Sequence, residues 1–482
     1  MTDRALPADQ RHPHGATLPK VAIIGGGPGG LMTAYLLQKK ANRPLRVTLF
    51  ERDDRLGGKI LTPRFHAAPV RYEAGAAEFY DYSELDDDPL KGLIAELGLD
   101  ITPMGGNSVS MNGLLISTLE DLRHELSPAA FRSFLRFHRA ARDELSPAEF
   151  LRAGGPEAPP PISPQRRFDS LLDRLDAASR SYVETLIHSD LATEPHQTTI
   201  EYGLHNYLMN DPAYMRLYGI DGGNEQLPQR LASRLHADVR LNHTVDAVGP
   251  LPDGRMTICS RIADHLLEET FDHVVMALPH DAVGRIKFNS AALRKEMLDH
   301  HQHHDHPAHY LRITILFESR FWKRDLVDSY CMLDRLGMCC LYDESSRTVE
   351  PRHGVLGWLL GGEAARSRST LPDADLIASA LDSLPPNLAQ GKKLAIEGRV
   401  HRWLGAVNAI PGGPVPLPLD QRHQPAPQTS PNLWVVGDYL FDSTLNGLFD
   451  SADYATDCLA AKLNEVAFQT RSPAKNCHGV NC

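Results

Sequence analysis

The feature that most constrains the fold of this chain is a buried strand followed by a glycine-rich turn and a helix. Residues 21–24 are a short apolar run, residues 25–30 read Gly-Gly-Gly-Pro-Gly-Gly, and residues 31–37 have the composition of an apolar helix. A second apolar strand over residues 45–50 ends at Glu51. This order is typical of a dinucleotide-binding βαβ unit, so we predict an α/β fold with a Rossmann-type domain.

The spacing of the glycines predicts how the loop holds a nucleotide. Gly25 allows the tight turn, Gly27 lets the backbone approach a pyrophosphate, and Gly30 lets the helix pack on the strand. The helix start then offers N–H groups and positive dipole to the phosphates. Glu51 is placed to accept hydrogen bonds from a ribose, and its charge disfavours the 2′-phosphate of NADP. The alternative is a tight turn in an unrelated α/β protein.

Composition and charge exclude several other classes of protein. With 482 residues the chain is too long for one core, and 42% hydrophobic with 23% charged residues is ordinary globular composition. A net charge of -11 argues against a nucleic acid or an anionic membrane as partner. Residues 1–20 are polar, and no apolar stretch reaches the ~18 residues of a spanning helix, so we expect a cytoplasmic protein. The seven cysteines lack zinc-type spacing and are expected to be reduced thiols.

The residues after the second strand resemble a known family. Residues 51–60 (ERDDRLGGKI) resemble the second flavoprotein fingerprint of the flavin amine oxidase and protoporphyrinogen oxidase superfamily, with Lys59 where the family usually has Arg. Six further segments resemble that family in order along the chain: residues 73–77, 222–228, 242–245, 272–279, 310–322 and 434–455. The resemblance implies the monoamine oxidase fold and FAD as cofactor.

The resemblance also implies which residues contact FAD. Residues 75–77 pass the flavin ring, the backbone of Val245 meets the adenine, and Gly437 with Asp438 meets the phosphate and ribityl chain. Gly447 and the helix after it are expected to point an N-terminus at the flavin's pyrimidine end, where reduced flavin is negatively charged. The full expected set is Gly25, Gly27, Pro28, Gly29, Gly30, Glu51, Arg52, Gly58, Lys59, Gly75, Ala76, Ala77, Glu78, Val245, Gly437, Asp438, Gly447 and Leu448.

The resemblance implies that FAD is bound without a covalent bond. Covalent members of the family attach the flavin through a Cys between the C-terminal Trp and the last glycine motif. No Cys lies between Trp403 and Gly437 in this chain. Acid precipitation is therefore expected to release the flavin.

The positions of these segments predict interleaved domains. The cofactor segments fall at the start, middle and end of the chain, so the material between them is expected to form a mixed α+β substrate domain. The expected FAD-binding domain comprises residues 1–80, 221–295 and 425–470. The expected substrate domain comprises residues 81–220 and 296–424, followed by a flexible tail at 471–482. Periodicity predicts helices over residues 119–151 and 168–187.

Four positions bear on catalysis, and each departs from the family pattern or has an ordinary structural alternative. Arg312 stands where family oxidases commonly have a Lys that holds a water at flavin N5; the alternative is an Arg facing solvent. Glu78 replaces the Arg that binds the carboxylate in amino-acid oxidases, and either attracts a cation or belongs to an exposed acidic loop. Leu448 replaces one aromatic wall of the amine cage. Trp403 matches a residue near the pocket and is equally a core residue.

Two other patterns are weaker. Residues 301–309 (HQHHDHPAH) precede a Pro in an expected surface loop, so we predict no metal site there. No Gly-x-Ser-x-Gly motif is present, so hydrolase chemistry has no support.

The sequence therefore predicts an FAD-dependent oxidoreductase. The favoured reaction is oxidation of a carbon–nitrogen bond of an amine or amino-acid derivative by hydride transfer to flavin N5. The alternatives are a carbon–carbon desaturase of the protoporphyrinogen oxidase or phytoene desaturase type, and a flavin-binding scaffold without turnover. The expected partners are a small-molecule substrate and oxygen or another electron acceptor; a homodimer is left open.

Overall fold

Five parallel strands in the order β19-β12-β1-β2-β8 form the sheet that carries the glycine-rich loop. The computed structural model describes residues 18–106, 108–152, 166–326, 328–347 and 352–469. The strands of this sheet are β1 (Lys20–Ile24), β2 (Arg46–Phe50), β8 (Ala237–Arg240), β12 (His273–Met276) and β19 (Leu433–Val435). The apolar runs of β1, β2, β12 and β19 are buried, as expected for a parallel sheet with both faces covered, whereas the edge strand β8 is only half-buried.

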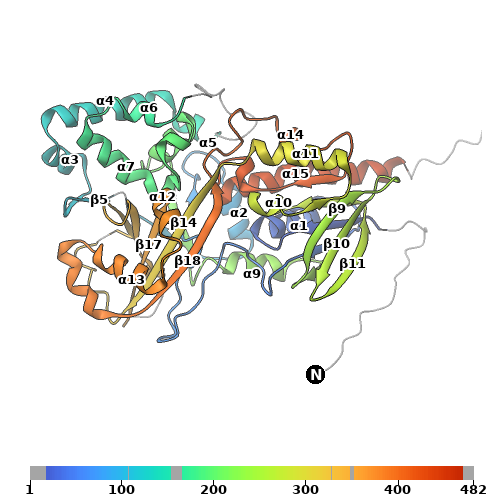
Figure 1. Ribbon diagram of the computed structural model, residues 1–482, viewed down its shortest axis with the longest axis horizontal. Helices are drawn as coiled ribbons and strands as arrows, with labels where there is room; N and C mark the ends of the chain where they lie inside the picture. Colours follow the sequence, from blue (N-terminus) through green and yellow to red (C-terminus); the bar gives the residue numbers. More distant parts are fainter. Residues whose placement is uncertain (1–17, 107, 153–165, 327, 348–351, 470–482) are drawn as a thin grey trace, which may run out of the picture.

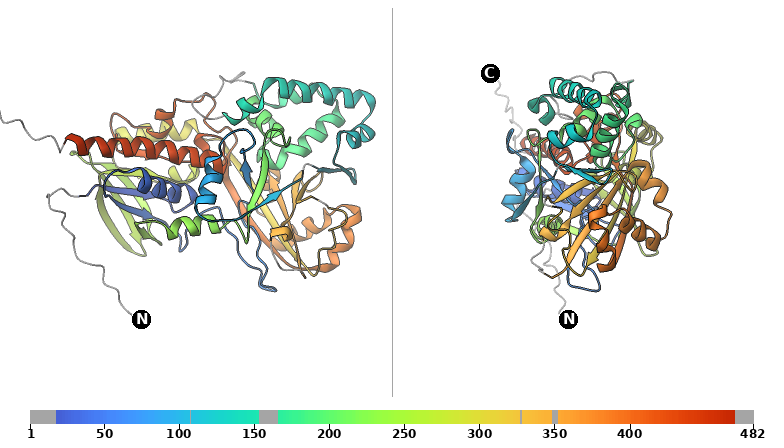
Figure 2. Two further views of the ribbon diagram at one scale, coloured as in Figure 1. Left: turned by 180° about the vertical axis from the view of Figure 1, so that it is seen from behind. Right: turned by 90° about the vertical axis from the view of Figure 1, so that its left-hand side faces the viewer.

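Helices cover this sheet and hold the start of the chain against its end. α1 (Pro28–Lys40) begins with Pro at its first turn, where the missing N–H costs nothing, and packs along α15 (Leu445–Gln469). α9 (Gln226–Ser233) also packs on α1. Figure 1 shows these helices in the right-hand part of the molecule, and Figure 2 shows α15 running along α1 from behind.

A seven-stranded sheet forms the other half, in the order β18-β14-β17-β16-β15-β5-β6. Its strands are β5 (Ser108–Met111), β6 (Leu114–Ile116), β14 (Pro307–Phe317), β15 (Tyr330–Leu333), β16 (Cys339–Asp343), β17 (Gly354–Gly361) and β18 (Ala395–Asn408). One face packs against α7 (Ala177–Leu191), and the opposite face against α13 (Asp373–Asp382). Figure 1 shows α7 above this sheet and α13 below it.

Two smaller sheets and several short helices complete the fold. The sheets contain β9 (Thr244–Pro250), β10 (Met256–Ile262), β11 (His265–Phe271) and β13 (Lys287–Phe288), and β3 (Phe79–Asp81), β4 (Ile101–Met104) and β7 (Arg216–Ile220). The remaining α-helices are α2 (Pro89–Glu96), α3 (Leu119–Glu125), α4 (Pro128–Glu144), α5 (Pro147–Leu151), α6 (Asp169–Leu172), α8 (Ile200–Leu208), α10 (His280–Val283), α11 (Ala291–His303), α12 (Gly362–Arg368) and α14 (Leu419–His423). Short 3-10 helices occupy η1 (Pro195–Gln197), η2 (Glu344–Arg347), η3 (Pro386–Leu394) and η4 (Asp438–Leu440).

The structure corrects three expectations. The helix expected over residues 168–187 is two helices, α6 and α7, because residues 173–176 are not helical and Asp176 caps the second helix. The helix expected over residues 119–151 is three helices, because Ser127 and Ser146 each cap a new helix that begins with Pro. Residues 301–309 are not a surface loop. They span the end of α11 and the start of β14, and His304 is fully buried with its ring 5.4 Å from that of Tyr439.

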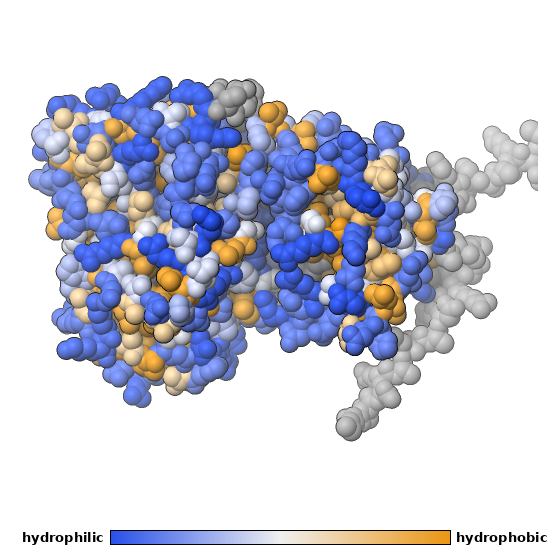
Figure 3. Space-filling view, viewed as in Figure 1, coloured by the Kyte–Doolittle hydropathy of each residue, from blue (hydrophilic) through white to orange (hydrophobic). Residues whose placement is uncertain are grey.

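The surface carries no extended apolar belt on the face in Figure 3, where hydrophobic residues are scattered among hydrophilic ones. Within the described residues, no helix is both long and apolar enough to cross a membrane.

Candidate active site: a nucleotide cradle beside an acidic, tyrosine-lined cavity

The glycine-rich loop turns tightly between β1 and α1. Gly25 has a φ of 108°, which side chains rarely adopt, and its N–H donates to Phe50 O at 2.8 Å. A Cβ on Gly30 would lie 1.9 Å from Gly25 O. Only glycine therefore lets the helix pack this closely on the loop.

Gly27, by contrast, borders free space. The nearest atom to a Cβ on Gly27 would be Gly58 Cα, at 3.9 Å. Gly27 is the N-cap of α1, and no side chain caps the helix, so the N–H groups of Gly29 and Gly30 are available at its start. A helix start with open space beside its backbone fits a pyrophosphate, and we call this the cradle.

Glu51 lies at the edge of the cradle and orders two loops. Its carboxylate accepts hydrogen bonds from Gly26 N at 2.7 Å and Asp53 N at 2.9 Å. Its carbonyl accepts from His243 N at 2.8 Å, which brings the segment before Val245 to the end of β2. Arg52 is exposed and pairs with Asp53 at 3.5 Å. A carboxylate oxygen accepts more than one hydrogen bond, so Glu51 retains capacity for a ribose hydroxyl.

A second glycine pair docks on the first. Gly57 N donates to Gly26 O at 2.8 Å, and a Cβ on Gly58 would lie 3.1 Å from Gly27 Cα. Lys59 then donates to Ala406 O and lies 3.4 Å from the Asp438 carboxylate. Lys59 and Asp438, which are distant in sequence, therefore form an ion pair beside the cradle.

Residues 73–77, which we call the strap, cross between the two large sheets. A Cβ on Gly75 would lie 1.8 Å from Lys59 O, and Ala76 N donates to that same oxygen at 3.1 Å. Trp403 donates its indole N–H to Ala74 O at 2.7 Å. The Glu73 carboxylate fixes the other end by accepting from Asn224 N and Thr62 Oγ1, both at 2.9 Å.

The start of α15 approaches the start of α1. Gly437 N donates to Ser451 Oγ at 3.1 Å, and Gly447 N to Thr444 Oγ1 at 3.0 Å. Leu448 Cδ1 lies 2.9 Å from the position of a Cβ on Gly29. Leu448 thus packs between the two helices.

Arg312 does not face solvent; it forms a buried ion pair with Glu344. Both side chains are 1% exposed. Arg312 Nε also donates to Glu73 O at 2.6 Å, and its guanidinium lies 5.1 Å from the centre of the Tyr342 ring. Burial lowers the pKa of Arg312, but Glu344, Tyr342 and Glu78 together outweigh burial and the pKa is raised. Arg312 therefore stays charged and holds one end of the strap.

The register of the seven-stranded sheet places Arg312 on a wall of polar aromatic residues. Tyr310 pairs with Trp403 across β14 and β18, and Arg312 is two residues further along the same face of β14. Gly357 lies beneath the ion pair, where a Cβ would lie 2.4 Å from a Glu344 carboxylate oxygen. Glycine there makes room for the two charged groups.

Between this wall and α7 lie four polar side chains that are only half-buried: Tyr80, Asp190, Tyr202 and Tyr310. Burial raises the pKa of each of them, so they are enclosed by protein although part of their surface is not packed. We infer that they border an internal space, which we call the cavity. Tyr342 donates to the Glu78 carboxylate at 3.0 Å, and Tyr310 donates to the Asp190 carbonyl at 3.2 Å. Glu78 is thus not part of an exposed loop.

Two carboxylates give this cavity its electrostatic character. Burial, and then the Glu78 carboxylate, raise the pKa of Asp190 from 3.8 to about 7. The Asp190 carboxylate accepts from Asn210 at 3.3 Å. Burial also raises the pKa of Tyr310 well above its ordinary value, with Tyr202 and Asp190 adding to it, so the phenol stays neutral. Glu78 and Asp190 therefore bring two carboxylates to this region, and the Arg312 guanidinium interacts with both Glu344 and Glu78.

Sequence reasoning missed Asp190 and Glu344. Neither belongs to a motif, and each reaches the site from an element far from the glycine loops. The one local sign was an Asp within the apolar helical segment over residues 182–192 (YVETLIHSDLA).

One further group could hold a metal ion by proximity: His280, His301 and Asp305. The two imidazole rings are stacked, 4.0 Å apart and 3° from parallel. A metal ion lies close to the plane of each ligating ring, and two stacked rings cannot both satisfy this. In this arrangement the group does not form a metal site.

Comparisons with known proteins find a family model and related sequences. Residues 28–459 match the family model described as flavin containing amine oxidoreductase. The flavin-dependent L-tryptophan oxidase RebO of Lentzea aerocolonigenes is 25% identical over 342 residues, covering 64% of this chain and 67% of that protein. Coproporphyrinogen III oxidase of Mycobacterium tuberculosis is 38% identical over 77 residues, 16% of each chain.

Solved structures share the whole fold. Putrescine oxidase bound to putrescine superposes with a TM-score of 0.72 and 19% identity, covering 92% of this chain and 99% of that one. Cyclohexylamine oxidase from Brevibacterium oxydans IH-35A superposes with a TM-score of 0.71 and 17% identity, covering 93% of this chain and 100% of the other.

Proposed function

The chain belongs to the flavin containing amine oxidoreductase family and is thus an FAD-dependent oxidoreductase, and on that premise we propose that it oxidises a carbon–nitrogen bond of a cationic amine. The observation that carries this proposal is the presence of two carboxylates, Glu78 and Asp190, among half-buried tyrosines at the cavity. The nearby cation, Arg312, forms a buried ion pair with Glu344. Such a cavity attracts an ammonium group and repels a carboxylate.

The cradle supports non-covalent binding of FAD. The free space beside Gly27 and the open start of α1 fit the pyrophosphate, and Glu51 fits the ribose. The strap, Lys59 and the start of α15 lie where the flavin end would follow. When bound, the flavin supplies the acceptor for a hydride. No Cys occurs between Trp403 and Gly437, so acid precipitation is expected to leave the flavin in the supernatant.

The protein's own residues would select and orient the amine. Tyrosine rings attract a cation through their faces, and Tyr342 holds the Glu78 carboxylate by a hydrogen bond. The Arg312–Glu344 pair fixes the strap from below through Glu73 O, so Arg312 acts as a positioning residue. The reacting amine must lose a proton before its carbon gives up a hydride, and a cavity carboxylate is suited to accept it.

The cavity disfavours the desaturase alternative for carboxylate-rich substrates. A porphyrinogen carries several carboxylates, and each would meet the same repulsion at Glu78 and Asp190. The scaffold alternative predicts no turnover with any substrate.

A matched substrate pair tests the proposal. Tryptamine and L-tryptophan differ only by a carboxylate, so anaerobic mixing with each isolates the effect of that charge on flavin reduction. We expect tryptamine to bleach the flavin at least tenfold faster than L-tryptophan, and simple alkylamines to bleach it too. Faster bleaching by L-tryptophan, or no bleaching by any amine, would contradict the proposal.

A further inference from the structure

We propose that a groove between α4, α6 and α8 binds an amphiphilic carboxylate, meaning an alkyl chain that ends in a carboxylate group. The groove has a volume of 410 Å³, and small-molecule sites in proteins span about 300–1,000 Å³. Figure 1 shows α4 and α6 at the top of the left-hand part of the molecule, away from α1, whose start forms the cradle. Binding in this groove would not depend on the proposed amine oxidation.

Apolar side chains form the floor of the groove. From α4, Phe137, Ala140 and Ala141 line it with the i, i+3, i+4 spacing of a single helical face. Leu171 of α6 and Leu175, which follows that helix, line it as well. Phe137, Leu171 and Leu175 are only half-buried, so part of their apolar surface is open to water. An alkyl chain lying in the groove would remove that surface from water, which is favourable.

Three guanidinium groups line the same groove. Arg136 lies on α4, Arg166 precedes α6 and Arg174 follows it, and all three are exposed. Within the described residues, the side chains of Arg136 and Arg174 form no ion pair and no hydrogen bond. Arg166 donates to Ser170 Oγ at 3.2 Å. Among the described lining residues Glu144 is the one carboxylate, so the groove is locally positive in a chain whose net charge is -11.

The class of ligand follows from the apolar floor and the arginines together. A guanidinium binds a carboxylate through two parallel N–H···O bonds, which suits a planar anionic head group. The alkyl chain behind that head group would cover Phe137 and the two leucines. A cationic amphiphile would cover the same floor, but the three arginines would repel its head group.

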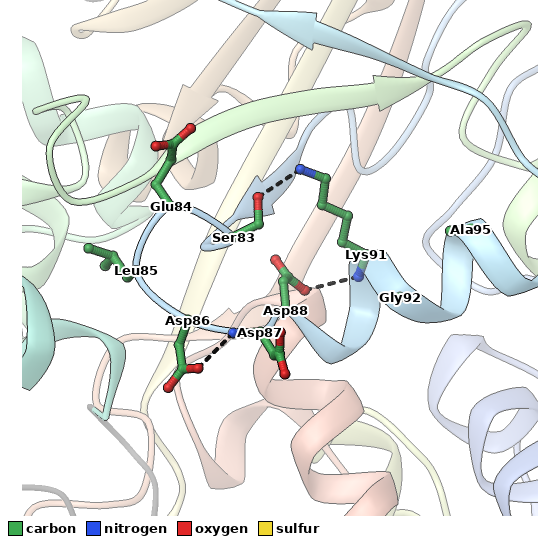
Figure 4. Close-up of a pocket in the computed structure, with 9 residues that line it drawn as sticks. All are labelled: Ser83, Glu84, Leu85, Asp86, Asp87, Asp88, Lys91, Gly92 and Ala95. Atoms are coloured by element: carbon green, nitrogen blue, oxygen red, sulfur yellow. Dashed lines mark hydrogen bonds between the residues drawn. The ribbon is translucent and has the colours of Figure 1, made fainter.

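A second surface hollow has the opposite charge. The hollow in Figure 4 has a volume of 520 Å³ and is lined by Asp86, Asp87 and Asp88 in the loop between β3 and α2. Its lysine, Lys91, already donates to the Asp81 carboxylate at 2.7 Å. An anion would be repelled there. The two hollows therefore differ in the sign of their charge, and only the groove at α4 suits a carboxylate.

Helix α8 separates the groove from the cavity. Ile200 and Leu204, one turn apart, line the groove. Tyr202 lies on the other face of the same helix and borders the cavity. An amphiphile in the groove would therefore occupy a site of its own, apart from the substrate.

Calorimetry on the FAD-loaded protein tests this inference. The two probes are dodecanoate, below its micelle concentration, and dodecyltrimethylammonium, which has the same chain and the opposite charge. We expect one site for dodecanoate, with an affinity about tenfold or more above that for the cation. The double variant Arg136→Gln/Arg174→Gln should bind dodecanoate about tenfold more weakly, because it lacks two charged donors.

Two further variants separate specific binding from general effects. Arg132→Gln/Arg139→Gln removes two exposed arginines of α4 that do not line the groove, and should bind dodecanoate as the wild type does. Ala140→Trp places a large side chain at an exposed lining position and should block the alkyl chain. Circular dichroism checks that each variant is folded.

Several outcomes would overturn the inference. These are no dodecanoate site in the wild type, equal affinity for the two probes, or equal weakening in the two double variants. Flotation with phosphatidylglycerol vesicles addresses a membrane surface as the alternative source of the anion. Vesicle binding that is lost in Arg136→Gln/Arg174→Gln, without a calorimetric site for dodecanoate, would also overturn it. None of these measurements requires turnover of an amine.

Discussion

The cradle and the cavity differ in the parts of the chain that form them. The cradle consists of backbone: Gly25 turns, Gly30 permits close packing, and Gly27 leaves space. The cavity consists of side chains, and Glu78, Asp190 and Tyr310 come from segments that are over a hundred residues apart in sequence. A backbone site can be specified by spacing within a few residues, whereas a side-chain site requires the whole sheet to be in register.

This difference implies that the two regions fail differently when altered. Changes in the cradle should remove the cofactor or the fold, in an all-or-none manner. Changes around the cavity should alter stability and substrate preference by degrees, because several side chains share each task.

The largest effect is expected at the cradle glycines. Gly27→Val should give a folded, colourless protein, since the backbone there is extended and the new side chain would occupy the free space. Gly30→Ala should fail to fold, because its Cβ would overlap Gly25 O. Circular dichroism and the visible flavin absorbance measure both results. Gly92→Ala, whose Cβ would have no neighbour within 4 Å, is the matched control.

If Gly27→Val retains flavin, the space beside Gly27 is not needed for the cofactor. If Gly30→Ala folds normally, close packing at Gly30 does not require glycine.

The next effect concerns the ion pair that joins the two regions. Arg312→Met leaves the Glu344 carboxylate buried without its partner, which typically costs about 3–5 kcal/mol of unfolding free energy. The strap would lose the hydrogen bond to Glu73 O, so turnover should slow at least tenfold, or ~1.4 kcal/mol of barrier, with FAD still bound. Denaturant unfolding and stopped-flow kinetics measure these changes.

The double variant with Glu344→Gln should recover most of the lost stability, because no buried charge remains unpaired. If Arg312→Met alone is as stable as the wild type, the Arg312–Glu344 ion pair does not support the strap.

The smallest effect is a pH-dependent gain in stability. The folded-state pKa of Asp190 is raised to about 7 from 3.8, so ionising it disfavours the folded state increasingly from pH 4 up to pH 7. Asp190→Asn removes that penalty and should raise the Tm by about 2–4 °C above pH 7, with the gain shrinking toward pH 4. Calorimetric melts across that range, with Asp173→Asn as control, measure it. A gain that is larger at pH 5 than at pH 8 would place Asp190 outside the enclosed cavity.

The candidate site residues show how far sequence reasoning extends. Motifs single out Trp403 and Glu78. They do not predict what these residues contact, because the partners Ala74 and Tyr342 lie far away in sequence. The sequence did not decide whether the Arg312 side chain faces solvent or the site. Its burial follows from Glu344, a residue in a short 3-10 helix with no motif of its own. The surface loop expected over residues 301–309 was wrong for the same reason. His304 is buried because it packs against Tyr439, and the local polarity of the sequence does not predict that contact.

By itself, the sequence determined the family, the Rossmann-type unit and the loop that would take the cofactor, because these depend on glycine and apolar spacing along contiguous chain. Only the tertiary structure decided that Arg312 is paired, that Leu448 packs between two helices, and that Asp190 joins Glu78 at one cavity. The physical reason is that charge compensation and enclosure depend on which distant side chains meet, and that is set by the register of the seven-stranded sheet and by the packing of α7 upon it.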